Sequence, residues 1–327
     1  MNKLFTRRQF LRGSLAAMAG IALSGMFRFP YQAEAQSAQP AFDLDRRVFH
    51  LSNGMQMPIL GLGTYTLMNR VAESSVLSAL ENGYRLIDTA AGYGNERGVG
   101  QGVQKSGVGR DEIFLTTKLW PTNVAMSDID HRLELLEMDY IDLLLLHQPD
   151  GDYVSAYRTM EEAVRQGKVR ALGLSNFTAT QIEEILEMAE IPPVLLQVET
   201  HLRHQQKLTA QYLKGREIAL EGWSPLGGRP NTPIFLTDET VQEIAGACGK
   251  TPAQVIIRWH LQSGRICIPG SSSADHIREN IDVFDFSLSE EEMERLNGMD
   301  RKEPFFPEMG PRDEDTLAVM QSLSMTD

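Results

Sequence analysis

The chain has 327 residues, with 31 Lys and Arg against 44 Asp and Glu and a formal net charge of −13. This acidic balance argues against a general nucleic-acid-binding protein, because no surplus of basic residues remains for phosphates. Hydrophobic residues make up 42% and charged residues 23%, as in globular proteins and unlike disordered ones. The two cysteines, Cys248 and Cys267, are too few for a disulfide scaffold or a structural zinc site.

The first 35 residues have the layout of an export signal. Basic residues precede an apolar stretch over 15–27 that is too short to span a bilayer comfortably. Residues 6–12, Thr-Arg-Arg-Gln-Phe-Leu-Arg, resemble the twin-arginine export motif, and residues 33–35, Ala-Glu-Ala, resemble a signal-peptidase site. We expect a twin-arginine signal peptide over 1–35 and a folded domain over 36–327. The protein would then meet the twin-arginine export machinery and reach the periplasm. A basic amphipathic N-terminus or an uncleaved membrane anchor is the alternative.

Short apolar runs alternate with amphipathic segments along the rest of the chain. Residues 47–58 carry Asn53-Gly54 between two short runs, which is a strong hairpin signal. Eight runs follow that we expect to be strands: 59–63, 85–88, 113–118, 141–147, 169–174, 194–198, 218–223 and 265–268. Apolar residues at three- and four-residue spacing predict helices that include 71–80, 128–136, 153–165, 181–188 and 238–248.

This alternation predicts an α/β protein with a parallel sheet, because each parallel connection needs a crossover segment. An open doubly wound sheet and a closed (β/α)8 barrel, or TIM barrel, both fit the pattern. No linker, charge run or internal repeat divides the chain, which favours a single barrel domain with an N-terminal β-hairpin cap.

Ionisable residues stand at the ends of three predicted strands. Asp88, Lys118 and His147 each close a hydrophobic run, where an unpaired buried charge would be costly, and Tyr93 follows shortly after Asp88. In a barrel these ends share one rim, where catalytic residues lie. Each residue taken singly could be satisfied locally, but their convergence predicts a site.

The residue types indicate proton donation to a carbonyl group. A tyrosine hydroxyl is a weak acid, but a neighbouring Lys ammonium would lower its pKa, and a carboxylate would hold that Lys in place. An imidazole could orient the carbonyl by a hydrogen bond. We find no cluster of metal ligands, since His201 and His204 lack a third ligand in register, and no activated Ser or Cys nucleophile. The electrons must therefore come from elsewhere, either as a hydride or from another electron source.

With these motifs in place, the chain resembles the aldo-keto reductase family along nearly all of residues 36–327. The matching segments are 61–64 (Gly-Leu-Gly-Thr), 87–96 (Ile-Asp-Thr-Ala-Ala-Gly-Tyr-Gly-Asn-Glu), 117–120 (Thr-Lys-Leu-Trp), 146–149 (Leu-His-Gln-Pro), 173–177 (Gly-Leu-Ser-Asn-Phe), 197–199 (Gln-Val-Glu), 223–226 (Trp-Ser-Pro-Leu) and 268–271 (Ile-Pro-Gly-Ser).

The resemblance implies a catalytic set of Asp88, Tyr93, Lys118 and His147, with Tyr93 as general acid. It implies NADP-dependent reduction of aldehydes or ketones to alcohols, of the alcohol dehydrogenase (NADP+) type. Alcohol oxidation by the same site is an alternative. So is a barrel that binds a dinucleotide without catalysis, although the complete set of four residues speaks against it.

No Gly-x-Gly-x-x-Gly fingerprint accompanies this resemblance, because Arg97 stands where the third glycine would be. The family instead binds its dinucleotide in an extended form across the barrel mouth. The implied cofactor contacts are Gly63, Thr64, Ser175, Asn176, Gln197, Trp223, Ser224, Leu226, Gly228, Ser271, Glu279 and Asn280. Ser175, Asn176 and Gln197 would hold the nicotinamide carboxamide, and Trp223 would stack on the ring unless it is a core aromatic.

The chain departs from the family where the 2′-phosphate of NADPH is bound. Gly270 and His276 stand where the family commonly has lysine and arginine. Two lost charge-assisted contacts, each about 1.5–3 kcal/mol, would weaken NADPH preference. Ser271 to Ser273 or Arg278 could compensate. We expect NADPH as the cofactor, with NADH possible.

Aromatic residues are expected to line the substrate pocket. These are Tyr65, Trp120 and Phe177, which suit a small apolar or mixed carbonyl substrate. The Phe305-Phe306 pair near the C-terminus either caps this pocket or fastens the C-terminal segment to the barrel. We expect a monomer.

Overall fold

The computed structural model of the protein describes residues 41–122, 124–311 and 313–324. Within these ranges eight strands form one parallel sheet in the order β11-β10-β9-β8-β7-β6-β5-β4. Their bounds are β4 Leu62–Gly63, β5 Leu86–Asp88, β6 Phe114–Leu119, β7 Ile141–Leu146, β8 Val169–Ser175, β9 Leu195–Glu199, β10 Ala219–Trp223 and β11 Ile266–Cys267. Each overlaps one of the predicted runs, so the predicted alternation is confirmed. The predicted signal peptide, residues 1–35, lies outside the described residues.

The sheet closes on itself between its first and last strands. The backbone N–H of Gly61 donates to the carbonyl of Cys267 (2.9 Å), and the N–H of Cys267 donates to the carbonyl of Ile59 (3.0 Å). The backbones approach closely here, since a Cβ on Gly270 would lie 2.8 Å from the carbonyl oxygen of Gly63. Of the two architectures that the alternation allowed, the structure is therefore the closed (β/α)8 barrel.

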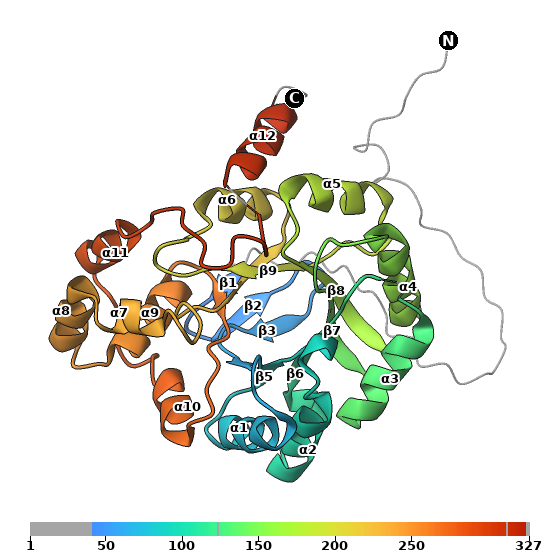
Figure 1. Cartoon of the computed structure of the whole chain (residues 1–327), viewed down its shortest axis with the longest axis horizontal. Helices are drawn as coiled ribbons and strands as arrows, with labels where there is room; N and C mark the ends of the chain where they lie inside the picture. The colour runs from blue at the N-terminus through green and yellow to red at the C-terminus, as the bar shows by residue number, and fades with distance from the viewer. Residues whose placement is uncertain (1–40, 123, 312, 325–327) are drawn as a thin grey trace, which may run out of the picture. The chain divides into compact units, whose positions relative to one another are not determined.

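Helices connect the strands and surround the barrel (Figure 1). They are α1 Asn69–Glu81, α2 Glu96–Ser106, α3 Met126–Leu136, α4 Tyr153–Arg165, α5 Ala179–Met188, α6 Lys207–Gly215, α7 Thr232–Leu236, α8 Glu239–Cys248, α9 Pro252–Gln262, α10 Ala274–Ile281, α11 Glu290–Asn297 and α12 Asp313–Ser324. All five ranges predicted to be helical are helical, except that Asp238 is the N-cap of α8. Local signals set several starts: α9 begins with Pro252 after Thr251, whose hydroxyl accepts from the N–H of Gln254 in a capping box.

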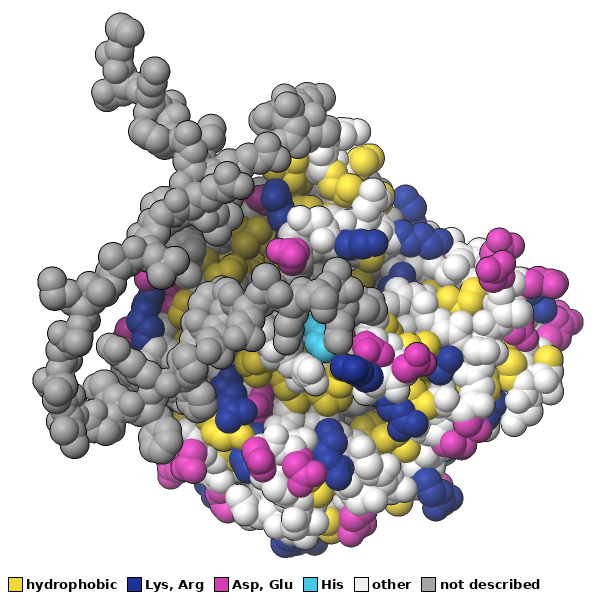
Figure 2. Space-filling model, turned by 180° about the vertical axis from the view of Figure 1, so that it is seen from behind, with side chains coloured by type: hydrophobic (Ala, Val, Ile, Leu, Met, Phe, Trp, Pro, Cys, Tyr) yellow, Lys and Arg dark blue, Asp and Glu magenta, His cyan; other side chains and the backbone are white. Residues whose placement is uncertain are grey.

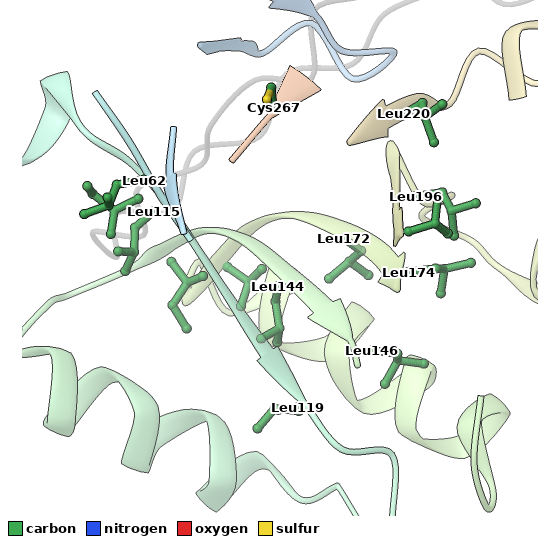
Figure 3. Close-up of a cluster of buried hydrophobic side chains, with 14 of the residues drawn as sticks. Leu62, Leu115, Leu119, Leu144, Leu146, Leu172, Leu174, Leu196, Leu220 and Cys267 are labelled. Atoms are coloured by element: carbon green, nitrogen blue, oxygen red, sulfur yellow. The ribbon is translucent and has the colours of Figure 1, made fainter. Parts of the chain in front are cut away.

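Alternate residues of the strands face the helices and form the main core. Figure 3 shows this layer, in which Leu62, Leu115, Leu144, Leu172 and Leu196 come from five strands of the sheet. Strands such as β7 (Ile-Asp-Leu-Leu-Leu-Leu) are buried along their whole length. Continuous apolar runs of this kind are expected where a parallel sheet is covered on both faces.

A small antiparallel sheet packs against the interior of the barrel. It contains β1 Phe42–Asp43, β2 Val48–His50 and β3 Gln56–Pro58, with Gly54 at φ +86° in the turn between β2 and β3. Leu51 and Met57 are buried in one cluster with Leu86 and Phe114, which start β5 and β6. The hairpin thus covers the end of the barrel at which the strands begin, and it leaves the end at which the strands finish uncovered.

The surface carries charges of both signs. Figure 2 shows the face opposite to that of Figure 1, where acidic and basic side chains of the described residues are interspersed. In the described part of the chain, no helix is long and apolar enough to span a bilayer.

Candidate active site

Three ionisable side chains and a tyrosine meet at the carboxyl ends of neighbouring strands. Asp88 is the last residue of β5, Lys118 is the penultimate residue of β6, and His147 directly follows β7. Tyr93 ends a short 3-10 helix, Ala91–Tyr93, after β5. Because the sheet is parallel, these strand ends open at the same end of the barrel. The structure thereby brings together the four residues that we expected to meet.

Lys118 lies at the centre of this group and is fully buried. Its Nζ donates hydrogen bonds to Asp88 Oδ1 (2.6 Å), to the carbonyl oxygen of Thr89 (2.9 Å) and to Tyr93 Oη (3.2 Å). An ammonium group has three hydrogens and no lone pair, so these three acceptors use all of them. Tyr93 Oη must then act as an acceptor toward Lys118, which leaves its own hydrogen for another partner.

Burial and charge together determine the protonation of Lys118 and Tyr93. Burial alone would lower the pKa of Lys118, but the Asp88 carboxylate and the Tyr93 hydroxyl outweigh it and hold that pKa above its ordinary value. For Tyr93, burial is the largest influence and raises the pKa, whereas Lys118 acts in the opposite direction. The ammonium has the effect that we expected, but burial exceeds it. Tyr93 is therefore a neutral phenol at neutral pH.

His147 is a neutral imidazole beside the tyrosine. Burial, followed by the charge of Lys118, lowers the pKa of His147 to about 3. Its ring lies edge-on to Tyr93, with the centroids 5.6 Å apart. Its Nδ1 is buried and has no hydrogen-bond partner within the described ranges. A neutral imidazole can hydrogen-bond a substrate without adding charge to the site.

Two of the three residues predicted to line the pocket stand at the rim of this group. Tyr65 is 67% exposed and lies 5.0 Å from Tyr93 between ring centroids, and Trp120 is 47% exposed with its ring edge-on to His147. Phe177 is different: it is completely buried in the outer core and packs edge-on against Tyr153 of α4. The expectation that Phe177 lines the pocket is therefore wrong. It lies two residues after the end of β8, but its side chain turns toward the helices.

Ser175, Asn176 and Trp223 lie together at the ends of β8 and β10. Asn176, at φ +66°, donates through Nδ2 to the carbonyl oxygen of His147 (3.1 Å) and to Ser175 Oγ (3.1 Å). Its Oδ1 accepts from Trp223 Nε1 (2.9 Å), so Trp223 is tied to the site and is not only a core aromatic. The other predicted contacts of this region, Ser224, Leu226 and Gly228, follow in the loop after β10.

Gln197 joins these residues to the catalytic group. It lies on β9, and its Nε2 donates to Asp88 Oδ2 (2.8 Å). Asp88 also holds Lys118, so one hydrogen-bonded chain runs from Tyr93 through Lys118 and Asp88 to Gln197. A change in the hydrogen bonds of Gln197 would therefore affect those of Tyr93, and the reverse.

Gly63 ends β4 on the other side of Asp88, and Thr64 directly follows it. The backbone N–H and the hydroxyl of Thr64 both donate to the carbonyl oxygen of Asp88 (3.0 and 2.9 Å). Thr64 is fully buried, so its hydroxyl serves to hold this strand end.

Ser271, Glu279 and Asn280 lie on the segment after β11. The hydroxyl of Ser271 accepts from the N–H of Ser273 (3.1 Å), and Glu279 accepts a hydrogen bond from the hydroxyl of Thr251 on α9. Asn280 is buried on α10. In this structure, therefore, the Ser271 hydroxyl and the Glu279 carboxylate are both bonded within the protein.

Asn95 lies in the matching segment 87–96, but the sequence alone indicated no role for it. Its side chain is fully buried, donates to the carbonyl oxygens of Thr64 and Leu67 (both 2.8 Å), and lies 2.8 Å from the hydroxyl of Thr89. It therefore fastens the loop that carries Tyr65 to the segment that carries Tyr93. The sequence indicated this role only by placing, between Tyr93 and α2, a side chain that can both donate and accept hydrogen bonds.

Glu199 was likewise quoted without a role, and it anchors the C-terminal segment. Its carboxylate accepts the backbone N–H groups of Phe305 (2.7 Å) and Phe306 (3.2 Å) and lies 2.9 Å from His201 Nε2. Phe305 stacks on His201, with the centroids 4.4 Å apart, whereas Phe306 packs against Trp223 at 5.4 Å. We expected the Phe305-Phe306 pair either to cap the pocket or to fasten the C-terminal segment. Phe305 fastens the segment, and Phe306 reaches the site through Trp223.

Glu221 was missed altogether. It lies in the middle of β10, is fully buried, and accepts a hydrogen bond from Gln197 Nε2 (2.7 Å). Burial, with the charge of Asp88 as the next influence, raises the pKa of Glu221 to about 8. Asp88 and Lys118 were indicated because each is a charged residue that closes an apolar run, whereas Glu221 is a charged residue inside such a run.

Residues 59–301 match the model of the aldo/keto reductase family. The chain belongs to this family. Aldo/keto reductases reduce aldehydes and ketones to alcohols with NAD(P)H, and the tyrosine, lysine and imidazole described above suit that reaction.

Individual relatives agree with the family assignment. A glyoxal reductase of Bacillus subtilis (strain 168) is 42% identical over 273 residues, which cover 82% of this chain and 96% of the relative. A morphine 6-dehydrogenase of Pseudomonas putida is 39% identical over 290 residues, covering 84% and 97%. Among solved structures, an aldo-keto reductase from a Medee basin deep-sea metagenome library has a TM-score of 0.76 at 40% identity, covering 79% of this chain and 96% of that one.

Replacement of Asn95 by alanine should loosen the mouth of this aldo/keto reductase. It removes the side-chain donor to the buried carbonyl oxygen of Leu67 and one of the two donors to that of Thr64, and we expect a loss of about 2 kcal/mol in the free energy of unfolding. Urea denaturation measures this loss, and faster amide hydrogen exchange over 64–68 would locate it. The matched control is Asn53→Ala in the partly exposed hairpin turn, where we expect a change within about 0.5 kcal/mol. Equal effects of the two variants would contradict the fastening role.

Proposed function

We propose that Tyr93 is the proton donor of an NADP-dependent carbonyl reductase of the alcohol dehydrogenase (NADP+) type. The observation that carries this proposal is the set of three hydrogen bonds from Lys118 Nζ. They commit the ammonium to Asp88, Thr89 and Tyr93, and the phenol hydrogen stays available. A carbonyl oxygen placed near Tyr93 Oη would accept that hydrogen.

Each residue of the group has a role in this reaction. Tyr93 gives its proton to the carbonyl oxygen as the carbonyl carbon is reduced, and Lys118 stabilises the phenolate that remains. Asp88 keeps the ammonium in place, and neutral His147 orients the carbonyl through a hydrogen bond. The reverse reaction, alcohol oxidation, would use the same groups in the opposite order.

The residues at the ends of β8, β9 and β10 fit a nicotinamide. Ser175, Asn176 and Gln197 offer a hydroxyl and two amide groups, which pair well with a carboxamide. Trp223 provides a flat ring next to them. When bound, a reduced nicotinamide would supply the hydride for the carbonyl carbon.

The structure around α10 supports weak discrimination between NADPH and NADH. Arg278 is the single Lys or Arg in 268–281, and it pairs with Asp275 (2.8 Å) on the exposed face of α10. A lysine at position 270 would bring its Cβ against the carbonyl oxygen of Gly63. We propose NADPH as the cofactor, with affinity for NADH within about tenfold, because charge-assisted contacts to the 2′-phosphate are few.

The substrates that we propose are small aldehydes and ketones. The exposed rings of Tyr65 and Trp120 at the rim suit a substrate with an apolar or mixed surface. Glyoxal is a first candidate, because a glyoxal reductase is among the most similar relatives named above. The barrel closes within one chain and all the residues of the site come from it, which supports a monomer.

We also propose that the protein is exported by the twin-arginine route to the periplasm, on the motif at Arg7 and Arg8. This route carries folded proteins, which suggests that a dinucleotide made in the cytosol is bound before export. Residues 1–35 would then be removed, and residues 36–327 would form the mature enzyme.

Replacement of Tyr93 by phenylalanine tests the proton donor. We expect kcat for reduction to fall by about 10²- to 10⁴-fold, the usual contribution of a general acid, while the dinucleotide Kd stays unchanged. The assay follows nicotinamide absorbance with glyoxal and a panel of other aldehydes and ketones. Tyr153→Phe is the matched control, because its hydroxyl contacts Glu184 at the surface. Full activity of Tyr93→Phe would overturn the assignment, and an inactive wild type that binds dinucleotide would favour a non-catalytic barrel.

Replacement of His276 by arginine tests cofactor choice. The guanidinium should strengthen NADPH binding about tenfold or more relative to NADH, because a single charge-assisted contact contributes about 1.5–3 kcal/mol. Titration calorimetry with both dinucleotides gives the ratio. Gln166→Arg adds the same charge after α4, at the opposite end of the barrel, and should leave the ratio unchanged. An NADPH preference above about 100-fold in the wild type would contradict weak discrimination.

Replacement of both Arg7 and Arg8 by lysine tests export. The twin-arginine machinery reads the arginine pair, so the variant should remain in the cytosol as the full-length precursor while the wild type appears in the periplasm. Cell fractionation and mass measurement distinguish the two. Wild-type precursor found only in the cytosol would refute the proposal. Periplasmic protein that carries no dinucleotide would refute loading before export.

A further inference from the structure

Glu221 is a carboxyl group enclosed by the barrel. On β10 it pairs in register with Gln197 of β9 and Ile266 of β11, one layer beneath Trp223. Its side chain is completely buried. A buried acidic group is costly unless a partner uses it, so its presence inside the barrel calls for a specific role.

The partner that uses Glu221 is the amide of Gln197. Gln197 Nε2 donates to Glu221 Oε2 (2.7 Å) and to Asp88 Oδ2 (2.8 Å). An amide nitrogen carries two hydrogens, and here both are given to carboxyl oxygens. The reversed amide would set its oxygen against the carboxylate of Asp88, which is repulsive, and would lose the hydrogen bond that Gln197 donates to Glu221 Oε2. The two acids therefore determine the orientation of Gln197 and leave Oε1 as its remaining hydrogen-bonding atom.

The two acids that accept from this amide differ in protonation. Asp88 accepts from both Lys118 and Gln197, whereas Glu221 accepts only from Gln197, and its Oε1 has no partner in the described part of the chain. The negative charge thus belongs on Asp88, next to Lys118. Burial and the charge of Asp88 raise the pKa of Glu221 to about 8, so that Glu221 is mostly a neutral acid at pH 7 and still offers an acceptor oxygen.

We propose that Glu221 is a positioning residue for the cofactor: by fixing the amide of Gln197, it presents Gln197 Oε1 to the N–H groups of the nicotinamide carboxamide. Glu221 touches neither cofactor nor substrate and acts only through Gln197. This inference rests on the proposed function, because it requires that a nicotinamide is bound beside Gln197.

The test compares variants that keep or remove the acceptor. Glu221→Met has a similar length but no acceptor, so the Gln197 amide can rotate, and we expect the dinucleotide Kd to rise about three- to tenfold, as for one lost hydrogen bond. Glu221→Gln keeps an oxygen for Gln197 Nε2 and should return Kd to within about twofold of the wild type. Glu221→Asp is one methylene too short to reach and should behave like the methionine variant. Calorimetry with NADPH and NADH gives Kd, and thermal unfolding is measured beside it.

A buried acid elsewhere supplies the matched control. Glu161 of α4 is 3% exposed and accepts the backbone N–H groups of Glu190 and Ile191, both at 2.7 Å. Glu161→Met should lower the melting temperature and leave Kd unchanged, because it removes a structural acceptor remote from the site.

The outcomes separate this inference from the proposed function. A wild type that binds neither dinucleotide would overturn both. If the wild type binds, an unchanged Kd in the methionine and aspartate variants would overturn the role of Glu221 alone. A Kd that glutamine fails to restore would do the same, because the effect would then not come from the acceptor oxygen. Should the methionine variant not fold, the aspartate and glutamine pair still decides the question.

Discussion

The site depends on the burial of one ammonium group. Lys118 is fully enclosed by the barrel, where an unpaired charge would cost several kcal/mol, so all three of its hydrogens must find acceptors. Asp88 and Thr89 at the end of β5 and Tyr93 in the 3-10 helix that follows are those acceptors. The requirement to satisfy Lys118 therefore aligns the tyrosine hydroxyl. The same arrangement of acceptors therefore stabilises the buried ammonium and positions Tyr93 for proton donation.

Much of this arrangement could be predicted from the sequence because burial leaves a clear pattern. Eight apolar runs separated by amphipathic segments predict a parallel sheet, and Asp88, Lys118 and His147 stand out because each ends such a run. Glu221 is also charged but lies within its run, where an inward-facing position is visible only once the register with β9 is known. The hairpin was predictable from its turn alone.

Other features depend on distances that a sequence does not contain. Phe177 follows a strand end as directly as other site residues do, and only the direction of its side chain places it in the outer core. The pKa of Tyr93 results from two opposing effects, and their balance requires the extent of burial. Phe305 and Phe306 make different contacts because Glu199, a residue about a hundred positions earlier in the chain, holds their backbone N–H groups.

The closure of the barrel has a consequence for how this protein is made. Gly61 and Cys267 are more than 200 residues apart, and their backbone bonds join the first strand of the barrel to the last. A nascent chain cannot form this seam until nearly all of it has left the ribosome, and contacts of such long range form slowly. Until then β4 is an open strand edge, which can pair with other chains. Synthesis must therefore be almost complete before the barrel is protected from aggregation, and a chaperone that covers the early strands would be of most use during that interval.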